Sequence, residues 1–272
     1  MTLLLQKSGK KTRAKNLLLG LNISNNGSAC LLENGKPVFY LEAERLSYKK
    51  HDFDIRWLLD KLPDCDIKHV AVSDAYWKRG DKQVENIKML AAVKRKYPGC
   101  RFYDYRKDHH LTHAACGFYN SGFESATCIV VDSNGSKTSA GLEIESMFFA
   151  PTWEVIHKTM FSPDNIGFGR RYEMASSAYG WHYMDAGKVM GKSAYDSEPA
   201  KSLQREWQER VLELVSMAPT DEIVFAGGCF LNCVANYNTL KKFPNKKLYA
   251  EPLAHDGGTA MGAAYLAYHA ND

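Results

Sequence analysis

Apolar residues gather in short runs separated by polar turns, and near the start of the chain this pattern predicts a three-stranded meander. A mainly apolar run at 16–24 ends in the polar turn Asn25-Asn26-Gly27. A second run, 28–33, leads into an Asn34-Gly35 pair, which is a strong hairpin signal, and a third run follows at 37–41. We therefore expect three consecutive strands joined by two tight turns.

A similar pattern returns in the second half of the chain. The apolar run 127–131 ends at Asp132, the turn Ser133-Asn134-Gly135-Ser136 follows, and further strands are expected near 139–144 and 147–150. The glycines of the two polar turns, Gly27 and Gly135, lie 108 residues apart.

This internal repeat predicts an α/β fold of two lobes that face each other across a central cleft. The two polar turns would then offer backbone N–H groups to phosphates. We place a basic arm at 1–15, an N-terminal lobe at 16–126 and a C-terminal lobe at 127–272. A chance likeness of two hairpins is the alternative.

Later segments predict one amphipathic helix and two glycine-containing turns. Ser202–Met217 has apolar residues at helical spacing. The segment 184–193 is expected to be a compact glycine–lysine turn. The strand 221–225 leads into Gly227-Gly228, where the absence of side chains suits either a ligand or tight packing. We favour a binding loop, because Asn232 and Asn236 would share the next helical face.

The segment from Asp108 to Ala115 holds two histidines that suit a metal site. His109 and His113 are four residues apart, which on a helix places both imidazoles on one face. Asp256, which precedes two glycines and a small-residue segment, is a candidate for the carboxylate that such a pair needs. The alternatives are surface histidines at a helix start and an aspartate that caps a helix.

Charge is distributed unevenly along the 272 residues. Residues 1–110 hold 22 Lys and Arg against 13 Asp and Glu, whereas the remainder holds 13 against 18. The first part therefore suits an anionic partner such as nucleic acid or nucleotide phosphate. The alternative is a solubilising tail, since the arm alone contributes five positive charges.

Composition favours a globular cytoplasmic protein. No apolar run is long enough to cross a membrane, and the first residues lack the order of a secretion signal. The seven cysteines are scattered without zinc-type pairing, which predicts buried free thiols in a reducing compartment.

Taken together, these motifs resemble the O-carbamoyltransferases of nodulation-factor and antibiotic biosynthesis, in their larger N-terminal domain. The matching stretches cover nearly the whole chain after the arm. They are Gly20–Ala29, Glu42–Asp52, Asp108–Ala115, Ile129–Asp132, Gly187–Gly191, Gly227–Asn236 and His255–Ala264. The resemblance implies the two-lobed actin-like ATPase fold, which is ribonuclease-H-like and shared with Hsp70 and sugar kinases.

The resemblance also implies a site. Fe²⁺ or another divalent metal would be bound by His109, His113 and Asp256. ATP-derived carbamoyl-adenylate would contact the two polar turns and the second glycine loop, and Asp132 and Lys188 would serve the chemistry. The residues expected at the nucleotide are Asn26, Gly27, Ser28, Asn134, Gly135, Gly191, Gly227, Gly228, Asn232 and Asn236.

Two departures from the family pattern matter. Many members have an acidic residue where this chain has Asn25-Asn26, so Asp132 or a metal-bound hydroxide is expected to deprotonate the acceptor instead. No stretch of this sequence resembles the family's second domain, which makes carbamoyl-adenylate from ATP and carbamoyl phosphate. We therefore expect either a separate adenylating protein or another use of carbamoyl phosphate.

The predicted function is transfer of a carbamoyl group to an acceptor hydroxyl. Charge weakly favours a nucleic-acid acceptor, such as a hydroxymethylated pyrimidine flipped out of DNA, over a sugar or other small molecule. A non-catalytic nucleotide- and metal-binding subunit of a larger assembly is the main alternative. A sugar kinase is weaker, because it leaves the histidine pair without a role.

Overall fold

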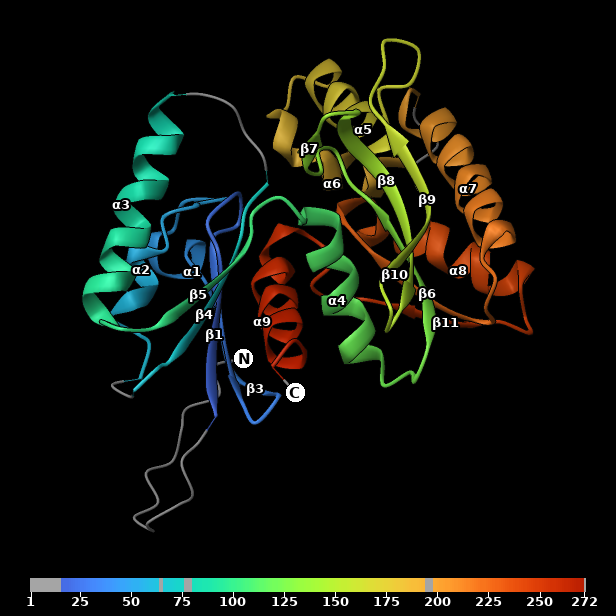
Figure 1. Cartoon of the computed structure of the whole chain (residues 1–272). Coiled ribbons are helices and arrows are strands. Elements are labelled where there is room, and N and C mark those ends of the chain that lie inside the picture. Colours follow the sequence, from blue (N-terminus) through green and yellow to red (C-terminus); the bar gives the residue numbers. More distant parts are fainter. Residues whose placement is uncertain (1–15, 64–65, 76–79, 194–197, 272) are drawn as a thin grey trace. The chain divides into compact units, whose positions relative to one another are not determined.

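The computed structural model describes residues 16–63, 66–75, 80–193 and 198–271, which form two compact units (Figure 1). The first unit comprises the described residues up to Cys116 together with those from Asp256 onward. The second unit is residues 117–255. The predicted arm at 1–15 lies outside the described residues.

The first unit is built on a five-stranded sheet in the order β3-β2-β1-β4-β5. Its strands are β1 Leu17–Asn22, β2 Ser28–Glu33, β3 Lys36–Glu42, β4 His69–Ser73 and β5 Arg101–Tyr105. The chain runs antiparallel from β1 to β3, as the hairpin signals predicted, whereas β1, β4 and β5 are parallel. The central strand β1 is buried along nearly its whole length.

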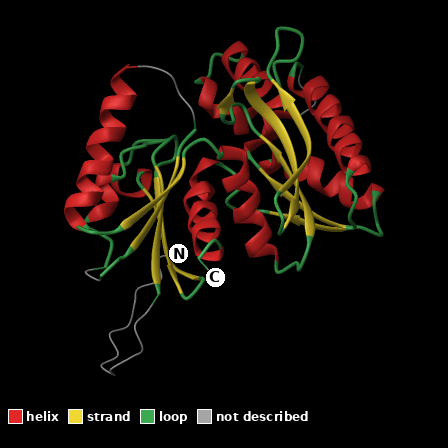
Figure 2. Cartoon of the chain, viewed as in Figure 1, coloured by secondary structure: helices red, strands yellow, loops and turns green. Residues whose placement is uncertain are grey.

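Helices cover both faces of this sheet (Figures 1 and 2). The short helices α1 and α2 and the long helix α3 lie on one face, and the small-residue helix α9 packs across β1, β2 and β4 on the other. The helices are α1 Glu44–Ser47, α2 Arg56–Leu59, α3 Gly80–Lys96 and α9 Thr259–His269, with the 3-10 turn η4 Asp256–Gly258 before α9. Gly20 on β1 allows the contact, because a Cβ there would lie 1.9 Å from the Ala260 carbonyl oxygen.

The second unit repeats the same arrangement of strands. Its main path is β11-β10-β6-β8, with β9 paired to the far edge of β8 and the short β7 also joined to β8. The strands are β6 Ala126–Val131, β7 Lys137–Thr138, β8 Gly141–Ala150, β9 Glu154–Met160, β10 Glu222–Ala226 and β11 Lys247–Ala250. Antiparallel pairs join β6, β8 and β9, and parallel pairs join β6, β10 and β11, as in the first unit. The predicted duplication is confirmed.

A large apolar core forms where helices pack on this second sheet. Trp207 and Val211 on α7 are fully buried in it, as the apolar spacing predicted. The helices are α4 His109–Ser121, which spans the unit boundary, then α5 Phe168–Ala178, α6 Ala186–Lys192, α7 Ala200–Met217 and α8 Cys233–Lys242. Two 3-10 turns, η1 Tyr183–Asp185 and η3 Gly228–Leu231, precede α6 and α8.

Two local predictions differ from the structure. The strands expected near 139–144 and 147–150 are one continuous strand, β8, because it pairs with β6 on one side and with β9 on the other. The segment 184–193, expected to be a turn, is mostly helix α6, in which the glycines are tolerated beside the buried Val189. The compact units also divide the chain inside α4 and group α9 with the first sheet, rather than separating two sequential lobes at residue 126.

None of the described helices is both long and apolar enough to cross a membrane. The six described cysteines are free thiols, and four of them are buried. Burial raises the pKa of the Cys30 and Cys128 thiols, so both remain protonated and inert at neutral pH.

Candidate metal centre

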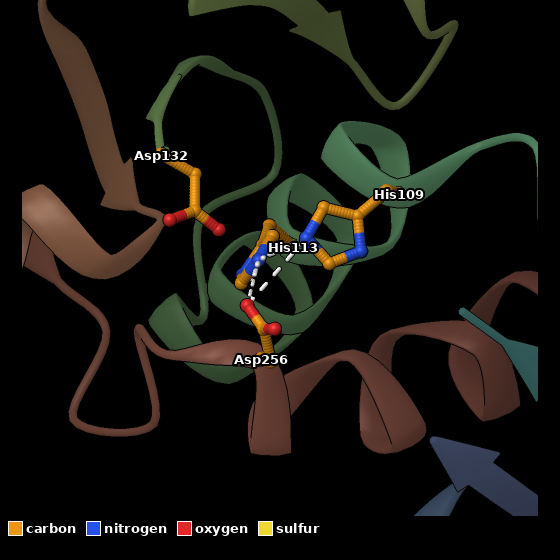
Figure 3. Close-up of side chains that lie close together, drawn as sticks. All are labelled: His109, His113, Asp132 and Asp256. Carbon is orange, nitrogen blue, oxygen red and sulfur yellow. Dashed lines mark hydrogen bonds and ion pairs between the residues drawn. The ribbon is translucent and has the colours of Figure 1, made fainter. Parts of the chain in front are cut away.

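Helix α4 positions the two predicted histidines as the sequence spacing requires. His109 and His113 lie one turn apart, and their side chains are 0% and 1% exposed. Their Nε2 atoms are 3.1 Å apart, so both imidazoles present the same ring nitrogen to one point (Figure 3). The alternative of surface histidines is therefore wrong.

Asp256 provides a carboxylate at the same point. It opens the turn η4, and its Oδ1 lies 3.6 Å from the Nε2 of His109 and 3.7 Å from that of His113 (Figure 3). These separations exceed the length of a hydrogen bond between the same atoms. The three groups converge, but they are spaced more widely than direct hydrogen bonding would place them.

Close contact between α4 and α9 brings these residues together from distant parts of the chain. A Cβ on Gly262 of α9 would lie 1.7 Å from the Thr112 carbonyl oxygen of α4. Only glycine therefore allows the two helices to approach this closely. Because Asp256 directly precedes α9 and the histidines lie on α4, this contact sets the distance between the two halves of the site.

The site favours an ionised carboxylate. Burial acts to raise the pKa of Asp256, but its interactions with the imidazoles of His109 and His113 outweigh burial and hold this pKa well below its ordinary value. An ionised carboxylate beside two imidazole nitrogens is a donor set that divalent transition metals bind in proteins.

The distances also fit a metal ion. A triangle with edges of 3.1, 3.6 and 3.7 Å has a centre about 2.0 Å from each corner, close to the ~2.0–2.2 Å of metal bonds to imidazole nitrogen and carboxylate oxygen. His109, His113 and Asp256 all belong to the first unit. These three residues could therefore hold a metal together without rearrangement.

The predicted nucleotide contacts in the first unit have partners within the protein. The Asn26 side chain hydrogen-bonds to His51 and donates to Glu44, and the Gly27 N–H donates to the Asp52 carbonyl. Gly27 is required by packing, because a Cβ would lie 2.5 Å from the Phe53 carbonyl oxygen.

The equivalent turn in the second unit is similarly occupied. The Ser133 N–H donates to the Asp132 carboxylate, and the Gly135 and Ser136 N–H groups donate to Glu143. Asn134 accepts two hydrogen bonds from the Arg170 guanidinium. A phosphate bound through these particular N–H groups would have to displace existing hydrogen bonds. Direct phosphate binding there, and the role of Asp132 as a base, stay predictions.

The second glycine loop is likewise explained in part by packing. Gly227 has a φ of +89°, and a Cβ there would lie 2.4 Å from the Val131 carbonyl oxygen. Asn232 caps α8 through the Ala235 N–H and hydrogen-bonds to Gln204 and Tyr172 while only 3% exposed. Its role as an adenosine contact would require these bonds to break.

Two predicted residues have more room around them. A Cβ on Gly228 would meet only the Asp132 carboxylate, at 3.2 Å, so backbone remains approachable there. Asn236 donates to the Phe230 carbonyl, but its buried Oδ1 has no hydrogen-bond partner among the described residues. Of the loop residues, these two remain the best candidates for ligand contact.

Lys188 and Gly191 lie on α6 rather than in a closing turn. The Lys188 ammonium pairs with Asp185 at 2.9 Å and lies 5.7 Å from the centre of the Trp181 ring. A Cβ on Gly191 would meet nothing within 4 Å. The structure therefore gives neither residue a packing reason for its identity, and their predicted contacts stay predictions.

One organising residue was not anticipated. Asn22, fully buried at the end of β1, accepts hydrogen bonds from the Ser24 N–H and hydroxyl and donates to the carbonyls of Asn25 and Asn26. An asparagine directly before a polar turn is the signal that would have identified it, since Asn side chains commonly bond to backbone two or more residues on.

Known proteins resemble this chain in sequence. Residues 189–265 match the family model described as carbamoyltransferase N-terminus. The nodulation protein NolNO of Sinorhizobium fredii is 26% identical in an alignment of 211 positions, which covers 58% of this chain and 30% of that protein. The uncharacterized protein sll1178 of Synechocystis is 22% identical, over 60% of this chain and 36% of its own. The chain spans about a third of the length of these curated relatives.

Solved structures share the fold at low sequence identity. The activator of 2-hydroxyisocaproyl-CoA dehydratase from Clostridium difficile, solved with ADPNP, has a TM-score of 0.56 at 13% identity, covering 93% of this chain and 95% of its own. The ROK hexokinase of Thermus thermophilus has a TM-score of 0.54 at 13% identity, covering 94% and 100%. The predicted actin-like ATPase fold, with its internal duplication, is confirmed.

Two of the sequence comparisons point to one relationship. The segment from α6 to α9 matches the carbamoyltransferase model, and the stretch that aligns with NolNO covers more than half of the chain. The chain thus resembles the N-terminal part of the carbamoyltransferases, as its motifs predicted.

Proposed function

We propose that this chain is the acceptor-side catalytic domain of an O-carbamoyltransferase, which moves a carbamoyl group from carbamoyl-adenylate to an acceptor hydroxyl. The observation that supports it most directly is the convergence of His109, His113 and Asp256 in the first unit. Sequence similarity to the carbamoyltransferase N-terminus supports the reaction class. A subunit that bound only the adenylate would not need this donor set.

The trio is proposed to bind Fe²⁺ or another divalent ion. Such an ion would supply Lewis-acid polarisation of a carbonyl or phosphate oxygen of the substrate. For both Nε2 atoms to face the ion, the ring protons of His109 and His113 must reside on Nδ1. The Asp256 carboxylate is ionised at neutral pH, as a metal ligand must be, because the ordinary pKa of an aspartate is about 3.9.

The proposed reaction balances as a simple acyl transfer. The acceptor oxygen bonds to the carbamoyl carbon, the bond between that carbon and the phosphate oxygen breaks, and AMP leaves with both electrons. The acceptor proton passes to a base, for which Asp132 is the proposed group. Lys188 is the proposed cation for the charge that develops, which requires release from Asp185. ATP and carbamoyl phosphate would enter through a step that forms carbamoyl-adenylate, in this or another protein.

Charge favours a polyanionic acceptor over a neutral one. Arg45, Lys49 and Lys50 are exposed on the first unit, and α3 ends in the run Lys94-Arg95-Lys96. A hydroxymethylated pyrimidine in DNA combines a hydroxyl with such a polyanion. Sugars and other small molecules with a hydroxyl group are the second class of candidate acceptor.

The function is tested by mass spectrometry of candidate acceptors. Hydroxymethylated DNA and a panel of sugars are each incubated with the Fe²⁺-loaded protein, ATP, ¹³C-labelled carbamoyl phosphate and a family adenylating domain added in trans. We expect one labelled carbamoyl group on the correct acceptor. Omission of the protein is the control, because carbamoyl phosphate decomposes to reactive cyanate.

The alternative function gives a different result. If metal and adenylate bind but no acceptor gains label, the chain is a non-catalytic subunit of a larger assembly. If neither binds, the proposed site itself is refuted.

A further inference from the structure

The loop that contains Asp256 is held to the first sheet by buried hydroxyl groups. The Ser28 hydroxyl donates to the Gly257 carbonyl at 2.7 Å, and the Thr259 hydroxyl donates to the Asp256 carbonyl at 2.6 Å. Ser28 and Thr259 are both 0% exposed. Two successive carbonyls of the loop are therefore fixed, one by the sheet and one by the first residue of α9.

A third hydroxyl extends this support back to the sheet. The hydroxyls of Ser73 and Thr259 lie 2.8 Å apart, and Ser73 is also fully buried. A hydroxyl has only one proton to donate. Thr259 uses its proton on the Asp256 carbonyl, whereas the Ser73 proton has two acceptors within reach, the Thr259 hydroxyl and the Leu21 carbonyl at 3.3 Å. The hydroxyls of Ser73 and Thr259 and the Asp256 carbonyl therefore lie in one row of polar contacts.

The sheet register explains why these residues meet. Asn22 on β1 pairs with Ser28 of β2 on one side and with Ser73 of β4 on the other. Three neighbouring strands thus present a row of polar side chains at one end of the sheet. The outer two members of the row contact the loop of Asp256, and the middle one, Asn22, organises the 24–26 turn.

Resting on the metal site of the proposed function, we propose that Ser28, Ser73 and Thr259 are positioning residues for that site. They fix the backbone at residues 256 and 257, and so hold the Asp256 carboxylate at 3.6 and 3.7 Å from the two imidazoles. Ser28 therefore serves the metal ligand rather than a phosphate, since its hydroxyl already donates to Gly257 inside the unit.

The competing explanation is that these hydroxyls only satisfy buried carbonyls, as most buried polar groups must be satisfied. That role would affect stability alone. A positioning role would in addition affect metal binding, because outer residues that orient metal ligands typically contribute about 10–100-fold in affinity.

The test uses two variants with matched controls elsewhere in the chain. Ser28→Ala and Thr259→Val each remove one hydroxyl from the support. Ser176→Ala and Thr239→Val make the same changes at sites in the second unit that are also 0% exposed, where the hydroxyls donate to the His182 and Ala235 carbonyls. Affinities for Co²⁺ and Fe²⁺ are measured by titration, together with the visible absorption spectrum of bound Co²⁺ and the melting temperature without metal.

We expect both site variants to lose about 10–100-fold in metal affinity and to alter the Co²⁺ spectrum, while the controls keep both. All four variants should lose similar amounts of thermal stability. If Thr259→Val does not fold, Ser28→Ala still tests the positioning role. Thr259→Ser keeps the hydroxyl and should retain wild-type affinity.

The outcomes separate this inference from the proposed function. Wild-type affinity and spectrum in both site variants would overturn the positioning role while leaving the metal site intact. Failure of the wild-type protein to bind Co²⁺ or Fe²⁺ would overturn the metal site and, with it, this inference.

Discussion

Asp256 joins two properties that seldom occur together in one side chain. It is largely buried, yet its pKa is held well below the ordinary value by its interactions with His109 and His113. The two imidazoles thus favour the ionised form of this carboxylate. Single substitutions should therefore act on the whole site.

We predict that His113→Ala, and separately Asp256→Asn, abolish stoichiometric metal binding with little change in the fold. Each removes one of three donors, and the remaining pair cannot complete the set. Metal content after dialysis, measured by atomic emission, is the readout. His157→Ala and Asp221→Asn, both in the second unit, are the matched controls. Full metal content in either site variant would refute the ligand assignment.

Substitution of Asp132 tests its proposed role as the general base. Asp132→Asn should lower the rate of carbamoyl transfer by about 10²–10⁴-fold, the usual contribution of a general base. The amide still accepts the hydrogen bond from the Ser133 N–H, so the turn should persist. The exposed carboxylate Glu154 provides the control variant Glu154→Gln. Unchanged turnover in Asp132→Asn would assign the base elsewhere.

At the scale of secondary-structure elements, one glycine determines how closely α4 and α9 approach each other. Their closest approach, at Gly262 and the Thr112 carbonyl, fixes the distance between the two histidines and the loop of Asp256. Amphipathic spacing does not specify α9, because this helix is buried from Thr259 to Ala267.

We predict that Gly262→Ala destabilises the protein by at least the ~1–3 kcal/mol of an overpacked core and weakens metal binding. The added methyl must push α4 away from α9, since the obstructing atom is backbone. Gly187→Ala on α6 is the control. A Cβ there meets nothing within 4 Å, and alanine should be neutral or stabilise the helix by about 0.5–1 kcal/mol. Equal effects of the two variants would contradict the packing argument.

Elements with strong local signals were predictable from sequence. Asn34-Gly35 specified the β2–β3 hairpin, and the apolar spacing of α7 specified its buried face. Helix α6 was not predictable from sequence, because its glycines and lysines are typical of a turn and only Val189 is buried. The continuity of β8 depends on pairing with both β6 and β9, which local sequence does not contain.

The candidate site was predictable only where its residues have a strong local signal. Histidines four apart lie on one face of any helix, so His109 and His113 could be paired from spacing, whereas Asp256 entered through its glycine context and the family motifs. The protein partners of Asn26, Asn134 and Asn232 were not predictable. An asparagine in a polar turn has the same sequence appearance whether it binds a ligand or another part of the chain.

At the scale of the whole molecule, the two units differ in chain continuity. The second unit is one uninterrupted segment, whereas the first is assembled from the two ends of the described chain. Helix α9 and the Asp256 loop therefore complete a sheet whose strands lie more than 150 positions earlier in the sequence.

We predict that deletion of residues 256–272 unfolds the first unit selectively. β1 and β4 would lose the helix that covers one face, and Gly20 would face solvent instead of Ala260. Hydrogen exchange followed by mass spectrometry should show lost protection in β1–β5 and retained protection in β6, β8 and β10. Protection retained throughout β1–β5 would show that α9 is dispensable for that sheet.

This interrupted chain order has a consequence during synthesis. When residue 116 leaves the ribosome, the sheet of the first unit still lacks α9, and 139 residues must be translated before Asp256 follows. At about 5–20 residues per second, the wait is on the order of ten seconds. During that time the half-built sheet exposes an apolar face, so nascent chains should be chaperone clients. A product truncated within the second unit would contain both histidines but not Asp256, and would therefore lack one of the three proposed metal ligands.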